Sequence, residues 1–344
     1  MVVAVDVVVA VDAADKSDRI RGLHMHRINV FVLAATGALL LQVLGKAATP
    51  DGKGFPSADA AAQALVSAAK SDDVANLIEI LGPSAKSIVV TRDPVADRKV
   101  RRDFAALAGQ KIRLAPSRGK QNAKTLLAGK NEWPFPIPIV QWNGQWYFDT
   151  TQGKHEILTR RIGRNELDAI EVCRGYVEAE SDYAEQNRTG NGVPIYAQKI
   201  VSSPGQRDGL YWPRSSGNDE SPMGEIVARA LAEGYTNKHE PYHGYYFKVL
   251  TGQGPHATGG AASYLDNGVM TKGFALIAWP ANYGSTGIMT FVVDKTGIVY
   301  QKDIGRKTAE IAAAYAAYDP DETWTPVSDP LPRVGRRSAE LQKR

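Results

Sequence analysis

The chain has 344 residues, of which 43% are hydrophobic, 23% charged and 8% aromatic, and its formal net charge is +4. This apolar and aromatic content excludes an intrinsically disordered chain, and the length suffices for one large or two ordinary domains. Cys173 is the only cysteine. The sequence therefore excludes an internal disulfide, a zinc or iron–sulfur site made of thiolates alone, and a lipid-bearing cysteine behind a signal sequence.

The positive charge lies at the two ends of the chain. Basic residues exceed acidic ones by one in 1–47 and by four in 333–344, which leaves about −1 for 48–332. A nucleic-acid-binding protein would show a basic face over a whole domain, so we expect no nucleic-acid partner. The basic tail at 328–344 is expected to be a solvated chain end.

Residues 28–44 form the longest apolar run. A basic residue precedes the run and small residues follow it, which predicts a secretory signal peptide at 25–47. Polar residues interrupt the run, so it is a poor membrane span, although an uncleaved anchor is the alternative. We expect residues 1–24 to come from a start codon assigned too early. The mature protein is then periplasmic, without a stable membrane span.

Residues 55–152 are expected to form a first α+β domain. Ser57 predicts the start of a helix, and a second helix spans 72–81 before Gly82 and Pro83. Apolar and β-branched stretches predict strands at 87–90, 111–115, 125–127, 137–142 and 145–149. Asn143 and Gly144 predict a hairpin turn, because both positions need a positive φ. Helices before a curved antiparallel sheet resemble, at the level of fold only, the cystatin and nuclear-transport-factor-2 (NTF2) class.

Residues 153–327 are expected to form a second α+β domain. A helical pattern runs from 155 to about 186 and places Cys173 on its apolar stripe, as a core residue. A further short helix is predicted at 223–234. Strands at 244–250, 273–279, 287–294 and 297–302 and a helix at 308–318 follow, and the Gly-rich loop 251–271 is a candidate functional loop.

His239, Glu240 and His243 fit the zinc-protease pattern H-E-x-x-H. That chemistry needs both histidines on one face of a helix, and Pro241 breaks a helix at this point. We therefore expect no metal site here, and no cofactor elsewhere. The basic cluster of Arg98, Lys99, Arg101 and Arg102 lies on a predicted polar helix and is expected to be a solvated face.

Aromatic and polar residues of the second domain are the candidate binding residues. Together with the loop 251–271, they could recognise an envelope protein or polymer without catalysis. They are His243, Tyr245, Asp266, Trp279 and Tyr283. One alternative is a hydrolase of envelope polymers that uses Glu240, Asp266 or Asp303 with His243. Another alternative is a small-ligand pocket in the first domain.

Three sequence stretches of the second domain resemble a known family. The stretch Glu240–Leu250 reads EPYHGYYFKVL, Gly273–Asp294 reads GFALIAWPANYGSTGIMTFVVD, and Gly297–Gly305 reads GIVYQKDIG. With Phe135-Pro-Ile-Pro, these resemble an uncharacterised exported bacterial family, domain of unknown function 2950, over about 50–327. The resemblance implies no established activity and no catalytic residue.

The order of elements within 165–303 also resembles the globular part of type IV pilins and type II secretion pseudopilins. Those proteins have an N-terminal helix, a variable region and then an antiparallel sheet. Their helix continues from about twenty apolar residues that drive assembly. Here the corresponding segment begins at Asn165, and it is preceded by Arg160, Arg161 and a whole domain. The resemblance therefore implies a pilin-like head without the polymerising segment.

Overall fold

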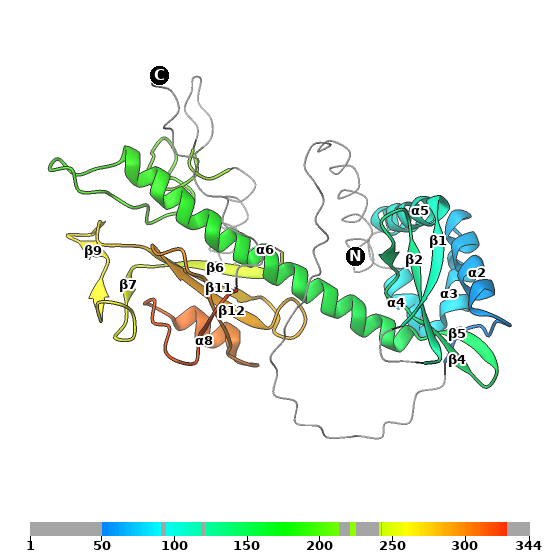
Figure 1. Cartoon of the computed structure of the whole chain (residues 1–344). Coiled ribbons are helices and arrows are strands. Elements are labelled where there is room, and N and C mark those ends of the chain that lie inside the picture. The colour runs from blue at the N-terminus through cyan, green and yellow to red at the C-terminus, as the bar shows by residue number, and fades with distance from the viewer. Residues whose placement is uncertain are drawn as a thin grey trace, which may run out of the picture. The chain divides into compact units, whose positions relative to one another are not determined.

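The computed structural model describes residues 50–90, 94–117, 121–212, 221–224, 241 and 243–328. The chain divides into two compact units at Arg161 and Ile162, within the helix α6 (Thr150–Gln186). The boundary expected from the sequence, between 152 and 153, lies near the start of that helix. Both units combine helices with antiparallel sheets, so the expected α+β class is confirmed (Figure 1).

Helices open the first unit. The hydroxyl of Ser57 accepts a hydrogen bond from the Ala60 amide at 3.0 Å, which caps the first helix as predicted. Asp73 caps the second helix, which ends at Gly82. The elements are α2 (Ala58–Lys70), α3 (Val74–Leu81), the 3-10 turn η1 (Pro83–Ala85), α4 (Lys86–Val89) and α5 (Pro94–Gln110).

Residues 87–90 do not form the expected strand. Residues 87–89 belong to α4, and the amide of Val90 donates to the carbonyl of Lys86 at 2.9 Å. The β-branched side chains suggested a strand, but the turn that starts at Pro83 continues directly into a helix. Ile88 and Val89 pack against the hydrophobic core of the first unit. Tertiary packing therefore overrode the local strand propensity.

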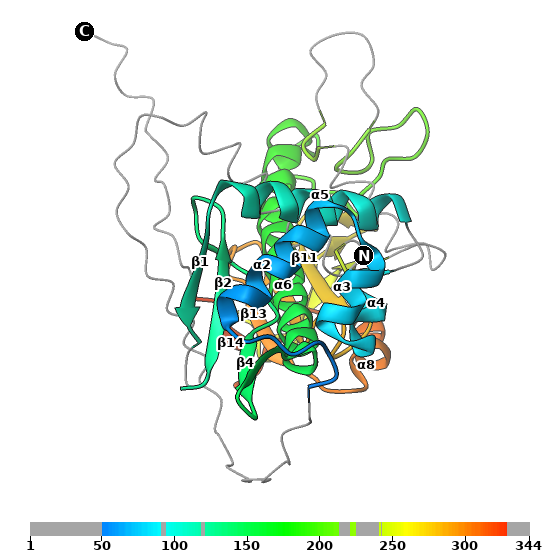
Figure 2. The same ribbon diagram turned by 90° about the vertical axis from the view of Figure 1, so that its right-hand side faces the viewer.

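One antiparallel sheet completes the first unit. Its strand order is β1-β2-β4-β5, with β3 paired to β2. Asn143 and Gly144 have φ values of 48° and 78°, which confirms the predicted hairpin turn. Helices α2, α3 and α5 lie on one side of the sheet (Figures 1 and 2). The strands are β1 (Ile112–Pro116), β2 (Ala123–Ala128), β3 (Trp133–Pro134), β4 (Ile139–Trp142) and β5 (Gln145–Phe148).

The second unit packs the C-terminal part of α6 against a five-stranded antiparallel sheet, ordered β14-β13-β12-β11-β6. Tyr176 of α6 is fully buried, with its ring 5.7 Å from that of Phe274. Cys173 is also fully buried, and burial raises the pKa of its thiol to about 12. Its prediction as a core residue is confirmed. The strands are β6 (Tyr245–Leu250), β11 (Ala275–Pro280), β12 (Met289–Asp294), β13 (Tyr300–Asp303) and β14 (Thr325–Pro326).

Short elements surround this sheet. Every residue of β11 is buried, so both faces of the sheet are covered at its centre, and α8 (Thr308–Ala314) packs against β11. The loop 251–271 contains two small hairpins. Tyr264, which lies between the two hairpins, and Met270, at the end of the second, are both buried. The hairpin strands are β7 (Gly252–Gln253), β8 (Ala262–Ser263), β9 (Leu265–Asp266) and β10 (Val269–Met270).

Several predictions fall outside the described residues. They are the leader at 1–24, the signal peptide at 25–47, most of the helix expected at 223–234, and nearly all of the basic tail at 328–344. These stay predictions. Among the helices that the structure does describe, none has both the length and the apolar composition needed to cross a membrane.

Candidate functional site

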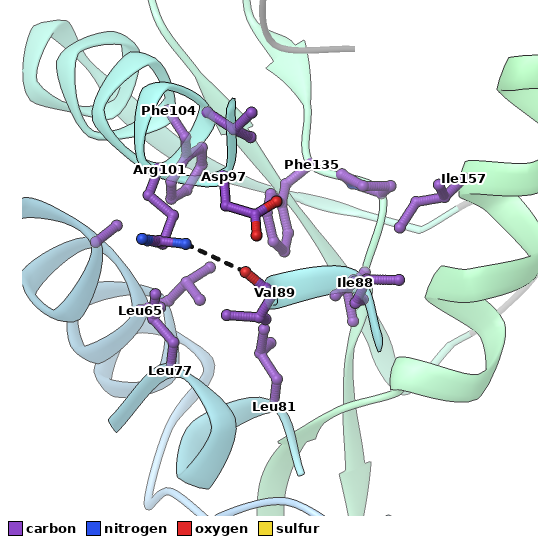
Figure 3. Close-up of a pocket in the computed structure, with 14 residues that line it drawn as sticks. Leu65, Leu77, Leu81, Ile88, Val89, Asp97, Arg101, Phe104, Phe135 and Ile157 are labelled. Carbon is purple, nitrogen blue, oxygen red and sulfur yellow. Dashed lines mark hydrogen bonds between the residues drawn. The ribbon is translucent and has the colours of Figure 1, made fainter. Parts of the chain in front are cut away.

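A partly open cavity lies in the first unit, between its helices and the segment that joins β3 to β4. Its volume is about 60 Å³. Helices α2, α3, α4 and α5 contribute most of the wall, and the start of α6 contributes Ile157. The wall is almost wholly apolar (Figure 3), and its larger side chains include Leu65, Leu77, Leu81, Ile88, Phe104 and Phe135.

The size of this cavity limits what can enter it. A buried water needs about 10–15 Å³, and an engineered apolar cavity of about 150 Å³ binds benzene. At about 60 Å³, the cavity itself has room for an aliphatic group of a few carbons, and any larger part of a ligand would extend through its open side. Because apolar walls offer a water few hydrogen bonds, an aliphatic group is the favoured occupant.

Two charged residues of α5 interrupt the apolar wall. Asp97 is only 7% exposed, and Arg101 follows it one helical turn later, with a side chain 13% exposed. Figure 3 shows the Asp97 carboxyl group and the Arg101 guanidinium both extending from α5 toward Val89. Charged groups are rarely buried unless they are paired, and these two lie at one end of the cavity wall.

Arg101 is held by two neighbouring elements. Its Nε donates to Oδ1 of Asp72 at 2.6 Å, and its Nη1 donates to the carbonyl of Val89 at 3.2 Å. The hydrogen bond from Arg101 is the main reason that the pKa of Asp72 lies below its usual value, and Arg98 adds a weaker attraction. Arg101 thereby ties the end of α4 and the turn between α2 and α3 to α5.

The opposite wall is positioned by α6. The hydroxyl of Thr150 donates to the carbonyl of Leu81 at 2.5 Å, which joins the start of α6 to the end of α3. Gly153 lets α6 approach closely, because a Cβ there would lie 2.5 Å from Cγ1 of Ile137, a residue of the cavity wall. The cavity is therefore assembled from segments far apart in sequence.

A small-ligand pocket in the first domain was one alternative from the sequence, but none of these residues was singled out for it. The cluster of Arg98, Lys99, Arg101 and Arg102 was expected to be a solvated face. That expectation is wrong for Arg101, whose guanidinium turns inward to Asp72 and Val89, while Arg102 is exposed. The available signal was the i, i+4 spacing of Asp97 and Arg101 next to Val100 and Phe104 on one helix.

The predicted binding residues of the second unit lie in different environments. Tyr245 is fully buried, and its hydroxyl donates to the carbonyl of Met289 at 2.9 Å. Trp279 is 9% exposed, with its ring 5.9 Å from that of Tyr246. Tyr245 and Trp279 therefore belong to the core rather than to an exposed aromatic face.

The other three predicted residues are more exposed. The hydroxyl of Tyr283 donates to Oδ2 of Asp303 at 3.2 Å. Oδ1 of Asp266 lies 3.6 Å from Nζ of Lys272. His243 adopts a left-handed conformation with φ 43° in the turn before β6, and its Nδ1 contacts the carboxylate of Asp168. Asp168 was not predicted, because it lies on α6, remote in sequence from His243.

The contact between His243 and Asp168 belongs to a junction between α6 and the sheet. The Asn165 side chain donates to the carbonyl of Thr286 at 2.8 Å. Oε1 of Glu166 accepts hydrogen bonds from the amides of Ile288 and Met289 at 2.9 and 3.1 Å. The arrangement fixes the helix to the loop between β11 and β12. Through Asp168, the same helix also contacts His243 in the turn before β6.

The hydrolase alternative places carboxylates beside His243. Glu240 lies outside the described residues, Asp266 is near Lys272, and Asp303 accepts hydrogen bonds from Tyr283 and the Gly305 amide. His243 itself lies in a turn, so it does not have the helical placement of a zinc-protease histidine. The described residues contain no group of three or more His, Cys, Asp or Glu side chains able to hold a metal ion.

Among the residues that the structure describes, the second unit also contains a buried acid. Glu180 of α6 has no exposed surface, and its Oε2 accepts a hydrogen bond from the Ala197 amide at 2.9 Å. Its Oε1 has no hydrogen-bond partner among the residues that the structure describes. Burial raises the pKa of Glu180 to about 8, although hydrogen bonds from Ala197 and Tyr176 oppose the shift. Glu180 is therefore mostly protonated at neutral pH.

These observations define a class of protein: a chain of two α+β units, of which the first contains a small, partly open apolar cavity with two charged residues at one end. The chain matches the family described as Protein of unknown function (DUF2950) over residues 52–327, and it belongs to that family. The expected family is thereby confirmed. No curated protein and no solved structure gave a match.

Proposed function

We propose that this protein is exported to the periplasm and acts there by binding a small ligand rather than by catalysis. The cavity of the first unit carries the proposal, because it combines an apolar wall with a charged end. The ligand would place an aliphatic group among Leu65, Leu77 and Phe104 and a polar group near Asp97 and Arg101. This is the small-ligand alternative of the sequence, made specific.

Export rests on the sequence. The apolar run at 28–44 and the small residues after it support a cleaved signal peptide. Expression in a bacterial host, fractionation and N-terminal sequencing test this step. We expect a periplasmic chain that begins near Ala48. A chain that begins at Met1 and stays in the cytoplasm would contradict export.

Ligand binding is tested by thermal unfolding with a panel of small aliphatic alcohols, amides, amines and acids. A ligand at ten times its Kd stabilises the folded state by about 1.4 kcal/mol. We expect at least one aliphatic compound to raise the Tm. If no compound in the panel does so, the cavity is only a packing defect and the proposal fails.

A matched pair of variants locates the binding. Val100 lines the cavity, whereas Val66 is equally buried and lies outside it. Val100→Leu reduces the free space, so we expect a weaker ligand-induced shift in Tm. Val66→Leu adds the same methylene elsewhere and should keep the shift. Far-UV circular dichroism confirms that both variants are folded.

We also propose finer fold relationships for the two units. The curved sheet with helices on one side supports an NTF2-like first unit. The second unit packs part of α6 on an antiparallel sheet, which supports a pilin-like head. Such a head would bind an envelope partner through the loop 251–271. Affinity capture with and without a shortened loop tests this role, which fails if both proteins retain the same partners.

A further inference from the structure

The strand β1 lies at one edge of the sheet of the first unit (Figure 2). The amide of Ser117 donates to the carbonyl of Ala123 at 3.0 Å, and the amide of Gly129 donates to the carbonyl of Lys111 at 2.8 Å. In an antiparallel pair, hydrogen-bonded positions alternate along each strand. The odd-numbered residues from Lys111 to Ser117 therefore bond to β2, and the even-numbered residues direct their backbone groups away from it.

The outward side of β1 offers donors and acceptors for a further strand. Ile112 and Leu114 each present an N–H and a C=O there, and Pro116 adds a C=O. Within the part of the chain that the structure describes, no strand pairs with this side. The opposite edge of the sheet is already occupied, because Phe55 and Trp146 of β5 exchange backbone hydrogen bonds of 2.9 and 2.8 Å. An edge strand without a neighbour is a template for pairing with another chain.

An open groove of about 420 Å³ lies beside this edge. Ile112 lines the groove from β1 and is 37% exposed. Its side chain lies on the same face of the sheet as that of Leu114, which packs against the core under the helices. A strand added to β1 would therefore direct every second side chain into the groove. The wall consists of Gln63, Val66, Ser67, Lys70, Ala108, Gly109, Lys111 and Ile112.

The groove and the edge carry an excess of positive charge. Lys70 and Lys111 line the groove, and Arg113 follows on β1. Glu132 pairs with two of these three cations, at 2.7 Å from Nη2 of Arg113 and 3.3 Å from Nζ of Lys111. Three cations and one carboxylate leave a local charge of +2, and the described wall of the groove contains no acid. This surface is complementary to an acidic partner.

We propose that the β1 edge binds an extended acidic peptide segment of a partner protein as an additional strand. The backbone of the segment hydrogen-bonds to Ile112 and Leu114, and its acidic side chains pair with Lys70 and Lys111. In this mode of recognition, the backbone hydrogen bonds supply affinity and the alternate side chains supply specificity. The inference goes beyond the proposed small-ligand function, because the groove and the cavity are lined by different residues.

Isothermal titration calorimetry with three capped decapeptides tests the inference on the purified protein at physiological ionic strength. The first alternates valine and glutamate. The second alternates valine and lysine, which keeps the strand pattern and reverses the charge. The third alternates proline and glutamate, which keeps the charge and removes every second N–H donor. We expect the valine–glutamate peptide to bind at least about tenfold more tightly than each of the others, since only it supplies both the hydrogen bonds and the complementary charge.

Hydrogen exchange, resolved to single residues by mass spectrometry with fragmentation, locates the bound peptide. With the valine–glutamate peptide, we expect the amides of Ile112 and Leu114 to exchange at least about tenfold more slowly, because they pass from open to hydrogen-bonded. The amides of Arg113 and Ala115 are bonded to β2 with or without the peptide and provide the internal reference.

A matched pair of variants tests the charge. Lys70→Gln removes one cation of the groove, and we expect it to weaken binding of the valine–glutamate peptide about two- to fivefold, as for an exposed ion pair. Lys86→Gln is the control, because Lys86 is exposed on α4 and does not line the groove. It should leave the affinity unchanged.

The measurements on the wild type decide the outcome even where a variant does not fold. If the valine–glutamate peptide binds no better than either of the others, or if exchange at Ile112 and Leu114 is unchanged, the inference is overturned. Analytical ultracentrifugation of the protein alone tests a second copy as the occupant. A dimer in which these two amides are already slow would also overturn the inference. None of these outcomes decides the small-ligand proposal, which the thermal-unfolding panel tests separately.

Discussion

The buried carboxyl group of Glu180 should make the stability of the second unit depend on pH. In the folded chain its pKa is about 8, compared with 4.5 for an unperturbed glutamate. Below pH 4.5, both the folded and the unfolded states carry the proton and the group costs no stability. Between these values the folded state keeps a proton that the unfolded state has lost, so stability falls as the pH rises.

The magnitude follows from the two pKa values. Each unit of difference corresponds to 1.36 kcal/mol. The loss therefore reaches about 4 to 5 kcal/mol above pH 8 and about 3 kcal/mol at pH 7. Such a loss is a large part of the stability of an ordinary domain.

The variant Glu180→Gln removes the titration and preserves the shape of the side chain. Its amide oxygen can still accept the hydrogen bond from the Ala197 amide. We expect the variant and the wild type to have similar free energies of unfolding near pH 4.5. At pH 9 we expect the variant to be more stable by several kcal/mol.

Urea unfolding, followed by tryptophan fluorescence at a series of pH values, measures the difference between the two proteins. Glu178→Gln is the control, because Glu178 lies on the same helix but is exposed. The free energy of unfolding of Glu178→Gln should change with pH in the same way as that of the wild type. If Glu180→Gln also runs parallel between pH 5 and 9, Glu180 does not keep its proton in the folded state and the reasoning is refuted.

Three further outcomes are expected. At pH 8, mass spectrometry should find that iodoacetamide does not modify Cys173 in the native protein, since its thiol is buried and has a pKa of about 12. After unfolding, Cys173 should be alkylated. Rapid alkylation of the native protein would contradict this burial. Ser57→Ala should cost about 1 kcal/mol in urea unfolding through the lost N-cap, and an unchanged midpoint would argue against the cap. Gly287→Ala should lower the Tm, because the new methyl group would overlap the Tyr245 hydroxyl. Gly175→Ala, which adds a methyl group in open space on α6, should instead raise the free energy of unfolding by up to about 1 kcal/mol. Equal effects of the two variants would contradict the close packing at Gly287.

Elements with local signals were predictable. Ser57 begins α2, and Asn143 with Gly144 closes the hairpin of β4 and β5, because each conformation depends on the residue itself and its nearest neighbours. The conformation of residues 87–90 was not predictable in this way, because their β-branched side chains are equally compatible with a strand and with a short helix. What decided between them was packing against α5, which lies later in the chain.

The site depended even more on contacts between distant residues. Arg101 looked like one member of an exposed basic cluster, and only its contacts with Asp72 and Val89 distinguish it from Arg102. Tyr245 looked like part of an exposed aromatic surface, but alternation along β6 turns it into the core. Residue type indicates what chemistry a side chain can perform, but not which side of an element meets solvent.

The sequence by itself determined the family, through the resemblance of its C-terminal motifs. It also determined the α+β class and the burial of Cys173, since periodicity and turn residues act over a few neighbouring positions. The tertiary structure alone decided where the cavity lies and that Asp97 and Arg101 form its charged end. It also decided that Glu180 is held without solvent against Ala197. The physical reason is that burial and electrostatics depend on distances through space, and those distances join residues that are far apart along the chain.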